Sequence, residues 1–246
     1  MLDKNNPKNL KKMSTAPSIL IVGIPGPGLI GTLSVSYLVH SLDMEIVGEI
    51  ENEDTTPVVF VDNGEIFGPI RIYKKESLYA ILSDTPIDYD MASGFSQSLI
   101  DFAQKNSIDM ILLLGGIPAS EKNADDIKTY GLATNAKLDA IMYENEIPKF
   151  LSGMIAGPDA TILTHLKNST IPSLILFTQC NFFFPDPESA MHAIETVARI
   201  VKRDVDLTEF KKQMNYLRLQ GRQLMEETLN VLQPEQEPQK PPQIYK

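Results

Sequence analysis

The residues from Gly23 to Gly31 read Gly-Ile-Pro-Gly-Pro-Gly-Leu-Ile-Gly and contain a literal G-x-G-x-x-G. Between a strand and a helix, this spacing is typical of loops that hold a dinucleotide pyrophosphate on backbone amides, and acidic residues follow about 20 positions on. Pro25 and Pro27, however, remove two of the amide donors that such binding needs. We therefore interpret Gly23, Pro25, Gly26, Gly28 and Gly31 as a structural glycine loop in a tight turn, and keep nucleotide binding as the alternative.

The C-terminal end of the chain, Ile244-Tyr245-Lys246, is a candidate for binding another protein. It follows residues 233–243, which hold four prolines and no large apolar side chain. Such a segment stays solvated, partly as polyproline II, because it cannot bury enough surface to offset its ordering entropy. Ile244 suits an apolar slot, Tyr245 offers a ring with a hydroxyl, and a terminal carboxylate pairs with a Lys or with backbone amides. The sequence thus predicts a spacer ending in a docking motif.

Residues suited to catalysis or metal binding are sparse. His40, His165 and His192 have no Cys, His or carboxylate nearby at metal-ligand spacing, so we expect no metal site. The single Cys180 follows an apolar run, and a small buried thiol is a more ordinary role for it than a nucleophile. One cysteine also suits a reducing compartment, which predicts a cytoplasmic protein. We expect no cofactor and no enzymatic activity.

The composition limits the partners. A formal net charge of -10 over 246 residues argues against nucleic acid or an anionic membrane as the main partner. No apolar run has the length of a membrane span. Residues 1–17 include a lysine-rich polar stretch without the apolar core of a signal peptide, and we interpret them as a disordered N-terminal arm.

The sequence predicts strands that alternate with helices, and these elements must position the candidate site residues. Continuous apolar runs predict buried strands at Ser18–Gly23, Asp109–Gly116 and Pro172–Thr178. Further strands are predicted at Glu45–Ile50, which closes a strand-helix-strand unit, at Leu78–Leu82 and Thr129–Thr134, and in a hairpin of residues 58–61 and 65–73 around Asn63-Gly64. Helices are predicted over 88–105, 136–142, 157–167 and 186–203. This order predicts an α/β fold, with a mostly parallel sheet covered on both faces over residues 18–204.

Residues 205–232 predict one long C-terminal helix. Its apolar and small residues recur at three- and four-residue steps: Leu207, Phe210, Met214, Leu217, Gly221, Leu224, Thr228 and Val231. This seam fits a helix packed on its own domain, or one that contacts another subunit and delivers the tail, residues 233–246, to one end of the particle.

The order of several short motifs resembles the proteasome assembly chaperone family, in particular archaeal-type relatives of assembly chaperone 2. These motifs are the glycine loop running into a helix, Leu114–Pro118, Tyr130–Asn135 and Phe184–Ala190, and the resemblance spans Ser18 to about Arg203. It implies a three-layer α/β sandwich like that of nucleoside phosphorylases without their catalytic residues. It further implies homo-oligomers that bind the α ring of the 20S proteasome, and Ile244-Tyr245-Lys246 matches the tail of members that dock there.

We therefore expect an ATP-independent assembly chaperone that docks Ile244, Tyr245 and Lys246 between 20S α subunits. Two alternatives stay open. The same tail could open the gate of the 20S particle, as in an activator, or the glycine loop could serve a nucleoside- or nucleotide-binding enzyme.

Overall fold

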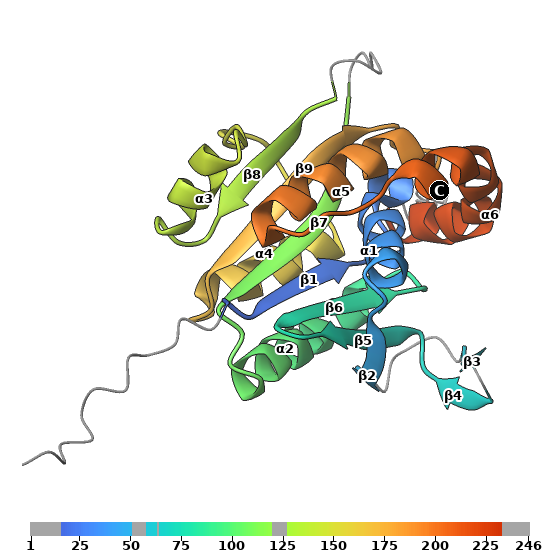
Figure 1. The fold of residues 1–246 in the computed structure, drawn as a ribbon, viewed down its shortest axis with the longest axis horizontal. Helices are drawn as coiled ribbons and strands as arrows, with labels where there is room; N and C mark the ends of the chain where they lie inside the picture. The colour runs from blue at the N-terminus through green and yellow to red at the C-terminus, as the bar shows by residue number, and fades with distance from the viewer. Residues whose placement is uncertain (1–15, 51–57, 63, 120–126, 233–246) are drawn as a thin grey trace, which may run out of the picture.

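A seven-stranded mixed sheet lies between two layers of helices in the computed structural model, which describes residues 16–50, 58–62, 64–119 and 127–232 (Figure 1). The strand order is β2-β5-β6-β1-β7-β9-β8. The parallel centre consists of β1 (Ile19–Gly23), β6 (Leu78–Ser83), β7 (Met110–Pro118) and β9 (Ser173–Cys180). Antiparallel pairs flank it, through β5 (Ile70–Lys75) on one side and β8 (Thr129–Ala133) on the other. The predicted fold class, a three-layer α/β sandwich around a mostly parallel mixed sheet, is confirmed.

The central strands are apolar throughout because both of their faces are buried. Along β1, Ile19 and Ile21 belong to one hydrophobic core, whereas Leu20 and Val22 belong to the other. Successive side chains of a strand point to opposite faces, so a strand between two helical layers needs an apolar residue at every position.

Each core is closed by its own set of helices. One face of the sheet carries α1 (Ile30–Ser41), α5 (Pro187–Val201) and α6 (Thr208–Leu232). The other carries α2 (Tyr89–Lys105) and α4 (Pro158–Asn168), while α3 (Leu138–Glu144) lies beside β8 (Figure 1). In the described part of the chain, no helix combines the length and apolar character that crossing a bilayer requires.

The first half of the chain departs from the expected strand-helix-strand unit. The strand after α1, β2 (Glu45–Glu49), is the edge strand and pairs antiparallel with β5, so that β5 and β6 separate it from β1. The expected strand over residues 65–73 is divided at Gly68-Pro69 into β4 (Glu65–Phe67) and β5. Proline lacks the amide that a continuous ladder needs, and β4 pairs instead with β3 (Phe60–Asp62) in a small separate sheet.

The long helix α6 runs along α1 toward the carboxyl ends of the central strands. Before its first turn, Asp206 O accepts a hydrogen bond from Tyr37 Oη at 2.5 Å, and the Phe210 ring packs edge to face on Tyr37 at 4.8 Å. Further along, Gly221 lies against Leu29, at the start of α1. Phe210 and Thr228 of the predicted apolar seam are buried, and so is the neighbouring Met225. This face of α6 therefore packs on the chain's own domain.

Candidate functional site

The two groups of predicted site residues have different outcomes. Ile244, Tyr245 and Lys246 lie outside the described residues, so the docking motif stays a prediction. The glycine loop, Gly23–Gly31, is described in full and lies where β1 leaves the sheet and α1 begins.

The glycine loop is buried over its whole length, and its turn uses its own amides. Pro25 forms the bend after β1, and a short 3₁₀ turn covers Pro27–Leu29. The Leu29 N–H donates to Gly26 O at 2.9 Å, and the Ile30 N–H donates to Pro27 O. These are donors that a phosphate site would aim at its ligand, and here they close a turn.

Three glycines allow backbone contacts that a side chain would block. A Cβ on Gly28, whose φ is 65°, would lie 2.9 Å from Cys180 Sγ. A Cβ on Gly31 would lie 2.7 Å from Leu114 O, and one on Gly116 would lie 2.2 Å from Pro27 O. The loop therefore fills the space over the ends of β1, β7 and β9, which is where ligands bind in many open α/β sheets. This packing supports the structural interpretation of the glycines.

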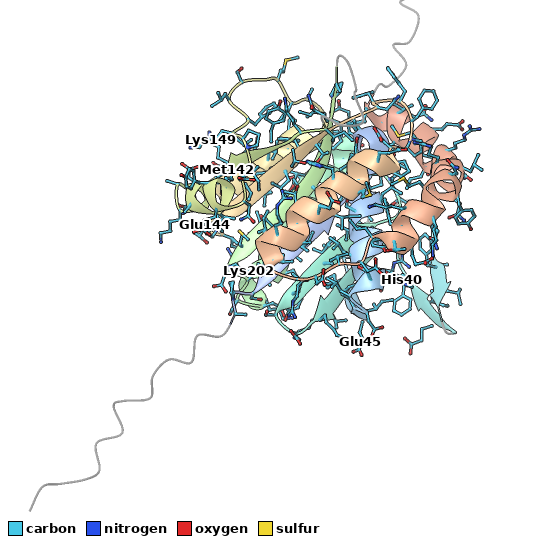
Figure 2. The ribbon with its side chains drawn as sticks, turned by 45° about the horizontal axis from the view of Figure 1, so that its top comes forward. His40, Glu45, Met142, Glu144, Lys149 and Lys202 are labelled. Carbon is cyan, nitrogen blue, oxygen red and sulfur yellow. The ribbon has the colours of Figure 1, made fainter. Side chains whose placement is uncertain are left out.

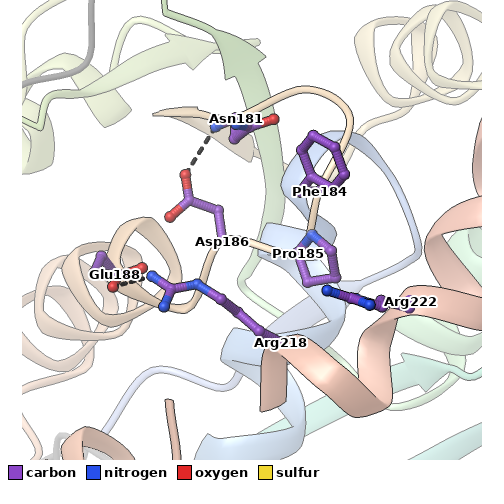
Figure 3. A pocket seen from close by; sticks show the side chains of 7 residues that line it. All are labelled: Asn181, Phe184, Pro185, Asp186, Glu188, Arg218 and Arg222. Atoms are coloured by element: carbon purple, nitrogen blue, oxygen red, sulfur yellow. Dashed lines mark hydrogen bonds and ion pairs between the residues drawn. The ribbon is translucent and has the colours of Figure 1, made fainter. Parts of the chain in front are cut away.

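Beside the loop lies an open pocket of about 340 Å³, here called the α6 groove (Figure 3). Asn181, Phe184 and Pro185 contribute to it from the segment after β9, and Asp186 and Glu188 from the start of α5. Arg218 and Arg222 project toward it from α6 (Figure 3). The groove therefore has aromatic, acidic and basic walls from three separate elements.

Asp186 fixes the wall of the groove to the rest of the fold. Its buried carboxylate accepts hydrogen bonds from Asn181 N at 2.8 Å, Ser189 N at 3.3 Å and Ser189 Oγ at 3.0 Å. It is the N-cap of α5, the helix predicted over residues 186–203, and it also holds the segment before the helix. The Asp186 N–H in turn donates to Gly28 O at 2.9 Å, so the wall of the groove is joined to the glycine loop.

The opposite wall is set by a close approach of α6. A Cβ on Gly221 would lie 2.9 Å from Pro185 Cγ and 3.1 Å from Leu29 Cδ1, so only a glycine lets the helix backbone come this near. Arg218 forms an ion pair with Glu188 across the groove. Gly221, which weakens the helical seam in the sequence, thus has a packing role.

Sequence reasoning did not assign Phe184 and Arg222 of the groove, or Phe183 next to it in the chain, to a site. Phe183 is 52% exposed and Phe184 is 62% exposed. Arg222 is exposed and forms no ion pair with any residue that the structure describes. The available signal was the run Phe182-Phe183-Phe184 directly after a buried strand, where a turn of polar residues is the usual pattern.

The histidines and the cysteine give no sign of a reactive centre. His40, His165 and His192 lie on three different helices, and Figure 2 labels His40 in the lower half of the view, to the right of Lys202 and above Glu45. Burial lowers the pKa of His192. Within the described ranges, no group of three or more His, Cys, Asp and Glu side chains is arranged to hold a metal ion. Cys180 is buried beneath Gly28 and Gly116.

Comparisons with known proteins agree with this fold. The uncharacterized protein MJ0106 of Methanocaldococcus jannaschii is 20% identical over 214 residues, which is 87% of this chain and 88% of that protein. The crystal structure of Pyrococcus furiosus PbaA, an archaeal homolog of proteasome-assembly chaperone, superposes with a TM-score of 0.81 at 18% identity, covering 88% of this chain and 96% of PbaA. Pyrococcus furiosus PbaB, an archaeal proteasome activator, gives a TM-score of 0.68 at 18% identity, covering 85% and 93%. A sequence model of the PAC2 family matches residues 20–225, from β1 into the last third of α6, and the chain therefore belongs to the PAC2 family.

Proposed function

We propose that this chain is an ATP-independent proteasome-binding protein that acts in assembly of the 20S core and docks Ile244, Tyr245 and Lys246 between neighbouring α subunits. The observation that carries the proposal is the PAC2 family match over residues 20–225, on a fold shared with PbaA and PbaB. The descriptions of those two proteins name proteasome assembly and proteasome activation.

Two features of the fold support a role in binding rather than catalysis. The glycine loop fills the crevice that α/β enzymes use for ligands, with Gly28 and Gly116 packed on Cys180. The helix α6 packs along the body and ends at Leu232, directly before the predicted tail, residues 233–246. A thermal-shift screen with nucleosides, NAD and phosphate tests the enzyme alternative, which predicts a saturable rise in melting temperature.

The tail works best in several copies. A single three-residue motif contributes little affinity, whereas several tails on a homo-oligomer gain roughly 10²- to 10⁴-fold in avidity through effective concentration. We therefore propose that the protein is a homo-oligomer and that the spacer length matters for reaching the ring. The chain's single cysteine, Cys180, is buried and cannot form a disulfide within the chain, which suits action in the cytoplasm.

The direct test removes the motif. We expect deletion of residues 244–246 to abolish measurable binding to purified 20S particles in biolayer interferometry, and Tyr245→Ala to weaken it at least about tenfold. Gln236→Ala, in the same segment but outside the motif, is the matched control and should bind as the unaltered chain does. Unchanged binding after the deletion would contradict the tail mechanism.

A gate-opening activator is the second candidate, and the likeness to PbaB favours it. Peptidase turnover by mature 20S particles separates the two roles. A pure assembly chaperone leaves turnover unchanged and raises the yield of 20S particles from separate α and β subunits. An activator raises turnover, and Tyr245→Ala should remove that gain.

A further inference from the structure

The α6 groove has the side-chain composition of a protein-binding surface. Phe184 lines the groove and is 62% exposed, and Arg222 lines it from α6. Outside the lining, Phe183 precedes Phe184 in the chain and is 52% exposed, and Leu219, 61% exposed, lies one helical turn from Arg222. Aromatic residues and arginine are enriched at the centres of protein interfaces, where a few of them contribute most of the binding energy. Exposed phenylalanines at two successive positions add nothing to the stability of the fold, so their exposure needs another explanation.

The groove is also pre-organised. Asp186 holds the segment before α5 through its bonds to Asn181 and Ser189, and Gly221 sets α6 against Pro185. A binding surface that is already fixed loses little conformational entropy when a partner arrives. The phenylalanines therefore stand on a rigid wall.

The charges of the groove define what it can accept. The charge of Arg218 is matched by Glu188, and Asp186 is occupied by backbone and hydroxyl donors. Glu188 Oε2 is buried and accepts no hydrogen bond from the described residues, so this oxygen can still take a donor. Arg222 has no ion-pair partner among the described residues, although the whole chain carries a net charge of -10. A partner with a carboxylate would complement it, and a volume of about 340 Å³ beside Phe184 has room for one large apolar side chain.

We propose that the α6 groove is a second docking site for the 20S particle, which binds a segment of an α subunit that carries a carboxylate beside a large apolar side chain. This inference rests on the proposed function, because tail and groove then bind one partner. The groove lies on the helix that leads to the tail: Leu232 is ten residues beyond Arg222, about 15 Å along the helix axis. The tail would supply reach, and the groove would fix the orientation of the body on the ring.

The test uses a chain that lacks only residues 244–246, so that the tail motif cannot mask the groove. We expect this chain to retain weak, salt-sensitive binding to 20S particles at high protein concentration in biolayer interferometry. Arg222→Glu should weaken that binding at least about tenfold, since it turns an attractive contact into a repulsive one, whereas Arg222→Lys should stay within about threefold. Lys211→Glu makes the same change of charge at an exposed position earlier on α6 and should leave binding unchanged.

The apolar wall is tested in the same background. Phe184→Ser should weaken binding at least about fivefold, while Met154→Ser, at a position that is 92% exposed outside the groove, should have no effect. A photo-reactive phenylalanine analogue at position 183 should cross-link to an α subunit, and the same analogue at position 154 should not.

The outcomes separate the two proposals. One contrary outcome is that the full-length chain binds 20S particles and the shortened chain does not. Another is that the shortened chain binds equally well with Arg222→Glu and Phe184→Ser. Either result overturns the proposal for the α6 groove and leaves the proposal for the tail motif standing. An equal loss with Lys211→Glu also overturns the proposal for the groove, because the effect would then be one of overall charge. If the full-length chain does not bind, the proposed function fails and the groove fails with it.

Discussion

The glycine loop and the α6 groove are neighbours with opposite character. They are joined by the hydrogen bond from Asp186 N to Gly28 O, yet the loop is buried throughout, while the groove exposes Phe184 and Arg222. The loop carries a motif associated with ligands and is filled by protein, whereas the groove carries no motif and is open. A glycine-rich motif therefore indicates that something comes close to the backbone, and only the surrounding packing tells whether that is a ligand or the protein itself.

The largest expected effect comes from adding a side chain inside the buried glycine loop. Gly28→Val should lower the free energy of unfolding by more than about 3 kcal/mol, because it adds overpacking against Cys180 to the strain of a β-branched residue at a φ of 65°. Denaturant titration followed by circular dichroism measures this loss. Gly26→Ala is the matched control: its added Cβ meets no atom within 4 Å, and we expect a change below about 1 kcal/mol. Equal effects at the two positions would show that the loop is not tightly packed.

The side chain of Asp186, which holds the wall of the groove beside the glycine loop, is the next target. Asp186→Ala removes the acceptor for Asn181 N, Ser189 N and Ser189 Oγ, and should cost about 2–3 kcal/mol of unfolding free energy because it leaves buried donors unpaired. Asp88→Ala removes the cap of α2, whose side chain accepts from Met91 N at 2.9 Å, and should cost about 1 kcal/mol. If the two variants lose equal stability in the same titration, Asp186 acts only as a helix cap, and its bond to Asn181 N adds nothing measurable.

The carboxylate of Asp159, on the other face of the sheet, tests the effect of burying a charge rather than of crowding side chains. Burial raises the pKa of Asp159, in the first turn of α4, to about 6 from its ordinary value of 3.8. The folded state then binds this proton more tightly than the unfolded state, so the unfolding free energy should fall as the pH rises from about 4 to about 6. Asp159→Asn should remove this dependence and raise stability at neutral pH by about 1–3 kcal/mol.

Urea titrations at several pH values measure the effect. Asp90→Asn, an exposed carboxylate in the first turn of α2, is the control and should leave the pH profile unchanged. A profile that Asp159→Asn does not alter would mean that water reaches this carboxylate.

The smallest expected effect sharpens the contrast. The added Cβ of Gly221→Ala would lie 2.9 Å from Pro185 Cγ, the same distance as the contact of Gly28 with Cys180. Here we expect a net change below about 1 kcal/mol, because alanine gains about 1 kcal/mol of helix propensity over glycine, which offsets much of the cost of crowding Pro185. Melting temperatures of the two glycine variants provide the comparison, and a loss at Gly221 as large as that at Gly28 would show that crowding at Pro185 outweighs the gain in helix propensity.

Local signals in the sequence predicted most of the elements. The continuous apolar residues of β1 and the sequence Asp186-Pro187 at the start of α5 depend on neighbours within a few positions, and both were correct. The strand β2 was predicted, but its place at the edge of the sheet was not, because it depends on pairing with β5, which begins more than twenty residues later. Strand pairing between remote segments leaves no mark in a short stretch of sequence.

The candidate site was less predictable for the same reason. Whether the glycine loop is open or filled depends on Gly116 and Cys180, which reach it from β7 and β9. The α6 groove depends on Gly221 meeting Pro185 across 36 positions, and nothing in either local sequence indicates that contact. The tail motif lies beyond the described residues and stays a prediction.

Because Cys180 is buried, the rate at which its thiol is labelled can report how often the fold opens locally. Cys180 is the single cysteine of the chain, and Gly28 and Gly116 shield its sulfur. A thiol-specific reagent can therefore react only during the brief intervals when the strand ends come apart, and the rate of labelling measures how often that happens. Measuring the labelling rate of Cys180 with and without 20S particles would show whether binding at the surface makes local opening of the interior less frequent. The native cysteine serves as the probe.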